Sequence, residues 1–260
     1  MYQFVCMINQ FVNGTSRDAA QTVSSWHNRR EYIDEESGDE MENPSKTAHD
    51  PEDPDFIPTR LRLVIILSGK RKSGKDHIST LLTNYLGYKR MQHLAILRIA
   101  GPIKKEFARN NKLDFTRLLD STEYKENFRL AMVRWSEEYR EKEGWNCFLK
   151  QAIKEQKAKD KLIWILNDAR RPCDLEYFEK DPAFQNTRVI KLRIEANKEA
   201  RVSRGWKFVN SIDDEDTECG LDDYEDWTYV IENNFNDEKQ PLNEALKPIF
   251  KEIDDALADL

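Results

Sequence analysis

LRLVIILSGKRKSGKDHISTLL, residues 61–82, decides the fold of this 260-residue chain. Residues 63–67 form an unbroken apolar run rich in β-branched side chains, which is typical of a strand buried on both faces. Residues 69–75, GKRKSGK, match the phosphate-binding loop pattern of a glycine, four residues, a glycine and a lysine. Apolar residues then recur at helical spacing: Ile78, Leu81, Leu82, Tyr85 and Leu86. Strand, loop and helix therefore follow the order that a phosphate site requires.

The loop and the helix behind it predict a polyphosphate site. Backbone N–H groups of a glycine loop point inward, and the helix N-terminus adds unpaired N–H groups and a positive dipole end. Lys75 would reach the β- and γ-phosphates, while Lys70, Arg71 and Lys72 add charge at the rim. Asp76 stands where a Ser or Thr hydroxyl normally binds Mg²⁺, and a carboxylate can also hold that ion. The alternative is an ordinary turn between a strand and a helix.

Cysteine usage and hydropathy restrict the class of protein. The cysteines are scattered, with no CxxC pair and no histidine at ligand spacing: Cys6, Cys147, Cys173 and Cys219. This usage indicates a reduced, cytosolic protein without structural zinc. No apolar run approaches the roughly 18 residues of a membrane span, and the mildly apolar start lacks the features of a signal peptide. We therefore expect a cytosolic protein with no membrane partner.

The net charge of −7 is unevenly distributed along the chain. Residues 31–55 hold eleven acidic residues against one basic residue, Lys46. Residues 56–260 have a net charge of +1 and carry local basic clusters on otherwise periodic segments. This pattern suits a small anionic substrate better than a nucleic-acid surface.

Residues 1–57 and 58–260 differ in composition, so we expect an acidic, disordered N-terminal extension followed by one folded domain. The segment from Glu31 to Pro58 is too acidic and too poor in apolar residues to offset its ordering entropy. A docking or phosphorylation tail and a solvated linker both remain open for it. We expect the domain to be a monomer.

Further strands are expected over residues 95–100, 161–166, 187–194 and 227–232. Helices are expected between them, including one from Thr122 to Arg140 and a closing one over residues 242–253. Strands that alternate with helices indicate a mostly parallel sheet covered on both faces. The expected fold class is therefore α/β: a phosphate-loop NTPase three-layer sandwich with a mostly parallel five-stranded sheet, similar to nucleoside monophosphate kinases, with a basic lid.

The third expected strand ends in NDARR, residues 167–171. An acidic residue at the carboxyl end of a core strand lies beside the crevice in which open α/β sheets bind ligands. Asp168 would there orient Mg²⁺, and Arg170 and Arg171 would face the same crevice. A structural role for all three is equally compatible with the sequence.

Cations also gather on the expected helices. Lys104 lies in the first turn of one helix, Lys125 and Arg129 are i, i+4 neighbours on another, and Arg140 lies near its end. Each of them could instead be a solvated charge on a helix surface.

A segment between the fourth and fifth strands has the composition of a lid. A short helix over residues 195–206 carries Arg201 and Arg204 on one face, and the acidic loop 213–222 follows it. A basic arm backed by an acidic loop is what a closing lid requires. A surface excursion is the alternative.

Seven segments together resemble the animal-type phosphomevalonate kinases: SGKRKSGKD (68–76), GPIKKEFA (101–108), LLDSTEYKENFR (118–129), MVRWSEEYR (132–140), NDARR (167–171), SRGW (203–206) and DTECGLD (216–222). The resemblance runs from about Leu61 to the C-terminus and includes Asp76. It implies transfer of the γ-phosphoryl group of ATP to (R)-5-phosphomevalonate, which gives 5-diphosphomevalonate and ADP in the mevalonate route to isoprenoids, with Mg²⁺ as cofactor.

The same resemblance implies a role for each matching residue. The catalytic residues would be Lys75, Arg71, Lys72, Asp76, Arg170 and Arg171. The ATP site would comprise Gly69, Lys70, Arg71, Lys72, Ser73, Gly74, Lys75, Asp76, Arg201 and Asn233. The acceptor would bind to Lys104, Lys125, Arg129, Arg140, Arg170, Arg171, Arg204 and Asn234. Mg²⁺ would be held by Asp76 or Asp168.

Two other functions remain open. One is a kinase of the same fold that acts on a nucleoside monophosphate or another phosphorylated metabolite. The other is a nucleotide-dependent switch that binds ATP without turnover. The many arginines expected on the acceptor side speak against the switch, because two phosphorylated molecules brought into line need their charges neutralised.

Overall fold

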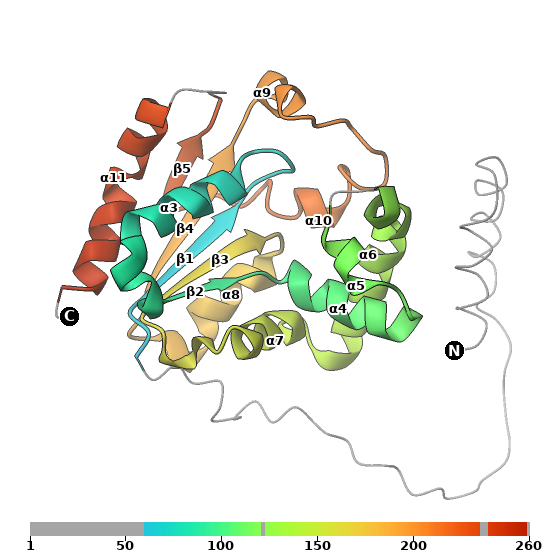
Figure 1. Cartoon of the computed structure of the whole chain (residues 1–260), viewed down its shortest axis with the longest axis horizontal. Helices are drawn as coiled ribbons and strands as arrows, with labels where there is room; N and C mark the ends of the chain where they lie inside the picture. Colours follow the sequence, from blue (N-terminus) through green and yellow to red (C-terminus); the bar gives the residue numbers. More distant parts are fainter. Residues whose placement is uncertain (1–59, 121–122, 235–238, 259–260) are drawn as a thin grey trace, which may run out of the picture. The chain divides into compact units, whose positions relative to one another are not determined.

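Strand β1, Leu63–Ser68, lies at the centre of a five-stranded sheet in this computed structural model, which describes residues 60–120, 123–234 and 239–258. The strand order is β2-β3-β1-β4-β5, and every pairing is parallel (Figure 1). The other strands are β2 (Leu94–Leu97), β3 (Ile163–Ala169), β4 (Arg188–Glu195) and β5 (Tyr229–Glu232). The α/β fold with five strands is confirmed, and the extension expected over residues 1–57 lies outside the described residues.

Along the described chain, most helices lie in the segments that connect one strand to the next. They are α3 (Lys75–Arg90), α4 (Ala100–Asn111), α5 (Phe115–Leu119), α6 (Glu123–Glu143), α7 (Cys147–Glu155), α8 (Pro172–Lys180), α9 (Lys198–Ser203), α10 (Asp216–Cys219) and α11 (Lys239–Ala256). Short 3₁₀ turns occupy Met91–His93, Ala158–Asp160 and Pro182–Phe184.

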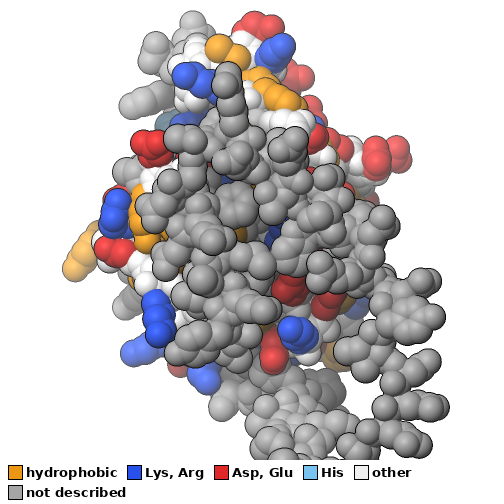
Figure 2. All heavy atoms as spheres, turned by 90° about the vertical axis from the view of Figure 1, so that its right-hand side faces the viewer, with side chains coloured by type: hydrophobic (Ala, Val, Ile, Leu, Met, Phe, Trp, Pro, Cys, Tyr) orange, Lys and Arg blue, Asp and Glu red, His pale blue; other side chains and the backbone are white. Residues whose placement is uncertain are grey.

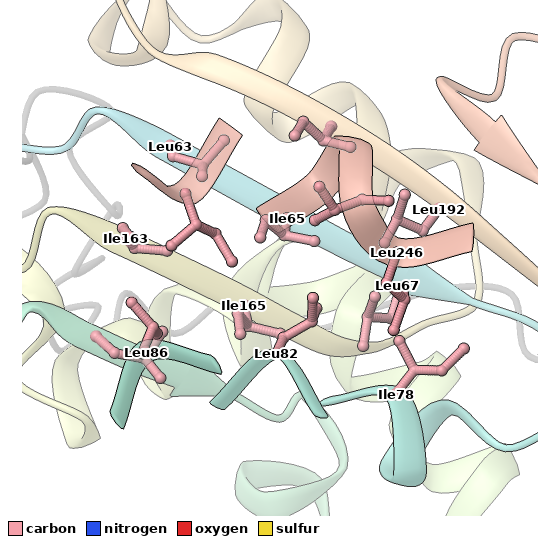
Figure 3. Packing of buried hydrophobic residues seen from close by; sticks show 14 of the residues in the cluster. Leu63, Ile65, Leu67, Ile78, Leu82, Leu86, Ile163, Ile165, Leu192 and Leu246 are labelled. Atoms are coloured by element: carbon pink, nitrogen blue, oxygen red, sulfur yellow. The ribbon is translucent and has the colours of Figure 1, made fainter. Parts of the chain in front are cut away.

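Alternate side chains of β1 pack on opposite faces of the sheet. Leu63, Ile65 and Leu67 point toward α3 and α11, where Leu82 and Leu246 meet them (Figure 3). The intervening residues belong to a second core with side chains of α7 and α8, among them Val64, Ile66, Phe148, Leu149, Leu175 and Phe178. Burial of one such side chain contributes about 1.5–3 kcal/mol. The apolar run is therefore a strand buried on both faces, as predicted.

The second strand is shorter than predicted, because the helix after it begins early. β2 ends at Leu97, and α4 begins at Ala100, before Gly101 and Pro102. Proline is favoured in the first turn of a helix, so the start of α4 precedes it. The carboxylate of Asp168 accepts the N–H groups of Ile99 at 2.8 Å and Ala100 at 2.9 Å. These bonds satisfy two of the donors that a helix start leaves unpaired.

The predicted boundaries also shift around the lid segment. β4 continues to Glu195 and β5 begins only at Tyr229. The helix predicted over residues 195–206 is α9, which is shorter because Asn197 caps it, accepting the Ala200 N–H at 2.8 Å. The acidic loop that follows contains one helical turn, α10.

The described surface mixes both signs of charge. On the face shown in Figure 2, basic and acidic side chains lie beside one another with scattered apolar ones among them. Within the described ranges, no helix has both the length and the apolar character needed to cross a membrane.

Candidate active site

The phosphate loop follows the carboxyl end of β1 and leads into α3. Gly74 has φ 104°, and a Cβ built on it would lie 2.1 Å from Nδ2 of Asn233. Gly69 has φ 150°, and its Cβ would lie 2.3 Å from the carbonyl oxygen of Ile194. Both positions therefore require glycine, because a side chain would be strained and would collide with a neighbouring strand end.

The Lys75 side chain points back toward the phosphate loop that precedes it. Its Nζ donates hydrogen bonds to the carbonyl oxygens of Gly69 and Lys70, the latter at 3.2 Å. Burial, followed by repulsion from Arg170, lowers the pKa of Lys75 to about 7. A phosphate beside this lysine would favour its charged form.

Two arginines reach the loop, Arg201 from α9 and Arg204 from the C-cap position of that helix. Nε of Arg201 donates to the carbonyl oxygen of Arg71 at 2.8 Å. Arg204 donates to the carbonyl oxygens of Ser73 at 3.2 Å and Asn233 at 2.8 Å. The Asn233 side chain itself donates to Ser73 O at 2.9 Å. Arg204, which the resemblance assigns to the acceptor, thus lies with the residues expected at the nucleotide.

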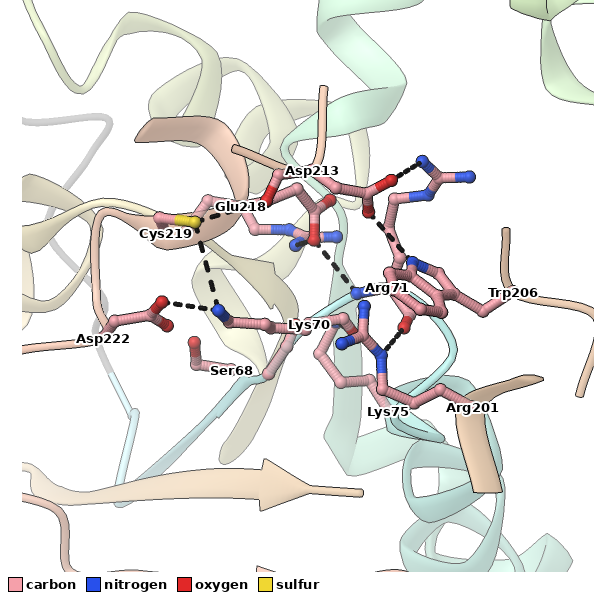
Figure 4. A network of polar contacts seen from close by, with 12 residues as sticks. Ser68, Lys70, Arg71, Lys75, Arg201, Trp206, Asp213, Glu218, Cys219 and Asp222 are labelled. Atoms are coloured by element: carbon pink, nitrogen blue, oxygen red, sulfur yellow. Dashed lines mark hydrogen bonds and ion pairs between the residues drawn. The ribbon is translucent and has the colours of Figure 1, made fainter. Parts of the chain in front are cut away.

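The acidic segment 213–222 supplies counter-ions to the loop (Figure 4). Asp213, whose side chain is 4% exposed, pairs with the guanidinium of Arg71 at 3.0 Å and accepts the indole N–H of Trp206 at 3.0 Å. Asp222 pairs with Lys70 at 2.5 Å. The guanidinium of Arg201 lies 4.2 Å from the centre of the Trp206 ring, close enough for a cation–π contact. The predicted lid segment therefore contacts the phosphate loop through ion pairs.

The two carboxylates expected to hold Mg²⁺ differ in their contacts. Both oxygens of Asp168 accept backbone N–H groups of α4, as described above. The Asp76 side chain is 79% exposed and pairs with Arg98 at 3.2 Å. Nδ2 of the buried Asn167 donates to the same Asp76 oxygen at 2.9 Å. Asp76 is therefore the better oriented and more accessible ligand for a cation.

A second group of cations comes from α4 and α6. Burial, and after it the neighbouring Lys125 ammonium, lower the pKa of Lys104 to about 8. The pKa of Lys125 is lowered by burial and then by Arg129. Arg129 is held by Glu126, with its Nε 2.8 Å from a carboxylate oxygen. Burial is the main cause of both lowered pKa values and repulsion between neighbouring cations the second, and lysines perturbed in this way are frequent in functional sites.

The remaining predicted residues have protein partners. Arg140 is 1% exposed, donates to the carbonyl oxygen of Trp145 at 2.5 Å and lies over the ring of Phe148. Oδ1 of Asn234 accepts the backbone N–H of Asn197 at 2.7 Å, which ties the start of α9 to the end of β5. Arg140 is therefore buried against Phe148, and Asn234 bonds to the start of α9, while the acceptor role that the resemblance assigns to both stays a prediction.

The two arginines after β3 face different partners. Arg170 pairs with Glu218 of α10 at 2.6 Å, and Arg171 pairs with Glu137 of α6. Each is thus positioned by a carboxylate from another element, at the strand end where the sequence predicted a crevice.

Sequence reasoning missed several residues of this site. Arg98 directly follows β2, and Asn167 lies two residues before the end of β3. The rule that ligands bind at carboxyl strand ends would therefore have found them. From the sequence, Asp213, Glu218 and Asp222 are recognisable only as parts of an acidic loop. Their pairing with loop cations about 140–150 residues earlier has no local signal.

Cations from several elements converge on one glycine loop, which suits the movement of a phosphoryl group between two anionic molecules. The fold and the site thus define a phosphate-loop kinase. A sequence model of the family described as phosphomevalonate kinase matches residues 67–185. The phosphomevalonate kinase of Drosophila melanogaster is 39% identical over 169 residues, which cover 65% of this chain and 86% of that protein. The chain belongs to the phosphomevalonate kinase family.

A solved structure was also matched. The crystal structure of TT1252 from Thermus thermophilus has 17% sequence identity and a TM-score of 0.39, with 75% of this chain and 99% of that chain covered.

Proposed function

We propose that this chain transfers the γ-phosphoryl group of ATP to (R)-5-phosphomevalonate, giving 5-diphosphomevalonate and ADP. The observation that carries this proposal is the second group of cations. Lys104 lies within electrostatic reach of Lys125, Arg129 and Asp168. Lys125 lies within reach of Arg129 and also of Arg71 and Asp76 at the loop that would hold ATP. A second phosphorylated substrate, with a carboxylate as well, is the partner that such a group of charges fits.

Positioning and charge carry the reaction in this proposal. A phosphate monoester is largely deprotonated at pH 7, because its second pKa is about 6, so the acceptor oxygen needs no strong base. Lys75 and the loop N–H groups hold the β- and γ-phosphates, and Arg170 lies beside Lys75 at the end of β3. The cations of α4 and α6 hold the acceptor in line, which lowers the repulsion between the two anions.

The residues present fit a Mg²⁺ ion bound together with ATP. When bound, the ion neutralises charge that develops between the β- and γ-phosphates. Asp76 would hold it, directly or through water, and Asn167 and Arg98 orient that carboxylate. Asp168 is engaged with the start of α4 and serves to place Lys104.

The test is an ADP-release assay with a panel of acceptors. Phosphomevalonate should support turnover, while mevalonate and nucleoside monophosphates should support less than about a hundredth of that rate, since each would lose two or more charge-assisted contacts, each worth roughly tenfold or more. Efficient turnover with a nucleoside monophosphate would assign the chain to the other class of kinase. ATP binding without acceptor-dependent ADP release would identify a switch.

We further propose that the enzyme works as a monomer in the cytosol. The cysteines of the described chain, Cys147, Cys173 and Cys219, are free thiols, which supports a reducing compartment. Size-exclusion chromatography with light scattering tests the monomer, and fractionation of cells tests the compartment.

A further inference from the structure

Glu218 of α10 makes the contacts that a phosphoryl oxygen would be expected to make. One oxygen atom, Oε2, accepts the backbone N–H of Arg71 at 2.9 Å and pairs with Arg170 at 2.6 Å. The first donor belongs to the phosphate loop, and the second follows β3 at the ligand-binding end of the sheet. Both are donors that this fold directs toward phosphates.

The contact of Glu218 is largely shielded from water. Its side chain is only 7% exposed, so bulk water screens the charges less than at the surface. A polyphosphate held by the same loop would bring several negative charges close to this carboxylate. Like charges at such distances repel each other, and the repulsion grows as the site is desolvated. Glu218 and a nucleotide phosphate therefore compete for the same donors.

Glu218 is also joined to the rest of the acidic segment. Asp213 pairs with the Arg71 side chain, and Asp222 pairs with both Lys70 and Arg193, the latter at 2.7 Å. Trp206 connects Asp213 to Arg201 of α9. A displacement of Glu218 would thus be transmitted to the segment that follows α9.

We propose that Glu218 is an internal competitor of ATP, a positioning residue that holds the Arg71 amide and Arg170 until a nucleotide phosphate takes both donors. This inference rests on the proposed function, because it requires that the loop binds a nucleotide. It explains why an acidic segment lies against a site for anions. In this role Glu218 limits the affinity for nucleotide and keeps Arg170 oriented before binding.

The experiment measures binding by isothermal titration calorimetry, with ATP and with inorganic tripolyphosphate as probes. Glu218→Gln keeps the shape of the side chain and removes its charge. We expect it to bind both probes about threefold to tenfold more tightly than the wild type, in keeping with the loss of a partly screened charge interaction. Tripolyphosphate should gain as much as ATP, because the competition concerns the phosphates alone.

Glu215→Gln is the matched control, because Glu215 is an exposed acid of the same segment. It removes the same charge and should change both affinities less than twofold. Equal gains for the two variants would mean that only the net charge of the segment acts, which would overturn the proposal. Unchanged or weaker binding by Glu218→Gln would overturn it as well. If Glu218 only stabilised the fold or ordered the substrate, its removal would not increase the affinity for either probe.

Thermal melting shows whether Glu218→Gln is folded, since Arg170 loses a counter-ion in it. If the variant does not fold, Glu218→Asp takes its place. Its shorter side chain should lengthen the contact and give a smaller gain in affinity, and no gain would contradict the proposal. Wild-type protein that fails to bind ATP would instead contradict the proposed function, so the two failures are distinguishable.

Discussion

Lys75 is the residue whose chemistry depends most on its surroundings. Its pKa is lowered to about 7 by burial and by Arg170, so above pH 7 the side chain is mostly neutral. A bound polyphosphate favours the ammonium. We expect ATP binding to take up a proton at pH 8, approaching about one per site, and almost none at pH 6, where the lysine is already charged.

Calorimetry in buffers of different ionisation enthalpy measures this uptake. Lys75→Arg is the control, because a guanidinium stays protonated in both states. It should bind ATP without the uptake seen at pH 8. Equal uptake by the wild type and by this variant would show that another group supplies the proton.

Replacement of Lys75 by methionine tests its role in the reaction. Lys75→Met keeps the bulk of the side chain and removes the charge that would bridge the β- and γ-phosphates. We expect kcat to fall about 10³-fold or more, as for other cations that stabilise phosphoryl transfer, with an unchanged circular dichroism spectrum. A variant that keeps a tenth of the wild-type rate would contradict the assignment.

Gly74 is the residue at which the loop leaves no room for a side chain. Gly74→Ala should abolish measurable ATP binding and lower the melting temperature, because its Cβ would meet the Asn233 amide at 2.1 Å. Gly144→Ala is the matched control, with φ 95° and no atom within 4 Å of its Cβ. It should cost only the backbone strain, about 1–3 kcal/mol, and leave ATP binding intact. Similar binding by both variants would show that the collision is relieved by movement of Asn233.

Among the elements, the position of α9 and of its C-cap residue Arg204 favours a different role from the one that the resemblance implies. The sequence suggested that Arg204 binds the acceptor, but its guanidinium lies on the phosphate loop and on Asn233. We expect Arg204→Ala to raise KM for ATP roughly tenfold to a hundredfold, with a smaller effect on KM for phosphomevalonate, since a charge-assisted bond is worth about 1.5–3 kcal/mol.

Arg204→Lys should recover only part of this loss, because an ammonium lacks the planar fork of N–H donors with which a guanidinium bonds two acceptors at once. Steady-state kinetics with each substrate varied in turn gives both constants. A larger effect on KM for phosphomevalonate would restore the assignment made from the sequence.

The elements also differ in how well the sequence predicted them. β1, the loop and α3 were predicted because a buried strand, a glycine motif and a helical stripe each leave a local pattern. The bounds of α8 were not predicted, although Pro172 at its start and Asp174, which accepts the N–H of Arg171 at 3.0 Å, mark a helix N-terminus. α10 has four residues, too few for any periodicity. Its position against the loop depends on tertiary contacts alone.

For the whole molecule, strand order explains which site residues could be predicted. β1 lies between β3 and β4, so their carboxyl ends meet, and residues at those ends are predictable neighbours. The positions of cations on helices are harder to predict, because the sequence does not show which face of a helix is directed toward the site. Arg140, for example, is buried against Phe148 of α7, and its expected role at the acceptor stays a prediction.

The division of the chain at residue 57 remains a prediction from composition. We expect deletion of residues 1–57 to leave kcat, both KM values and the melting temperature nearly unchanged, because a segment without a core of its own contributes little packing. Leu61, which is buried, and Arg62, which donates to the carbonyl oxygen of Ala256 at 3.1 Å, are retained in this variant. Insoluble protein after truncation would show that the extension packs on the domain.

The central position of β1 has a consequence for the synthesis of this protein. Leu63 lies beside Ile163 and Arg188, so the first strand pairs with partners that are translated about 100 and 125 residues later. Ribosomes add about 5–20 residues per second, which leaves β1 and its apolar side chains unpaired for roughly 5 to 25 seconds. Such a delay invites chaperone binding to the nascent chain, and non-local parallel pairing is itself slow. The phosphate loop, fixed at the end of this strand, is therefore completed late in folding although it is translated early.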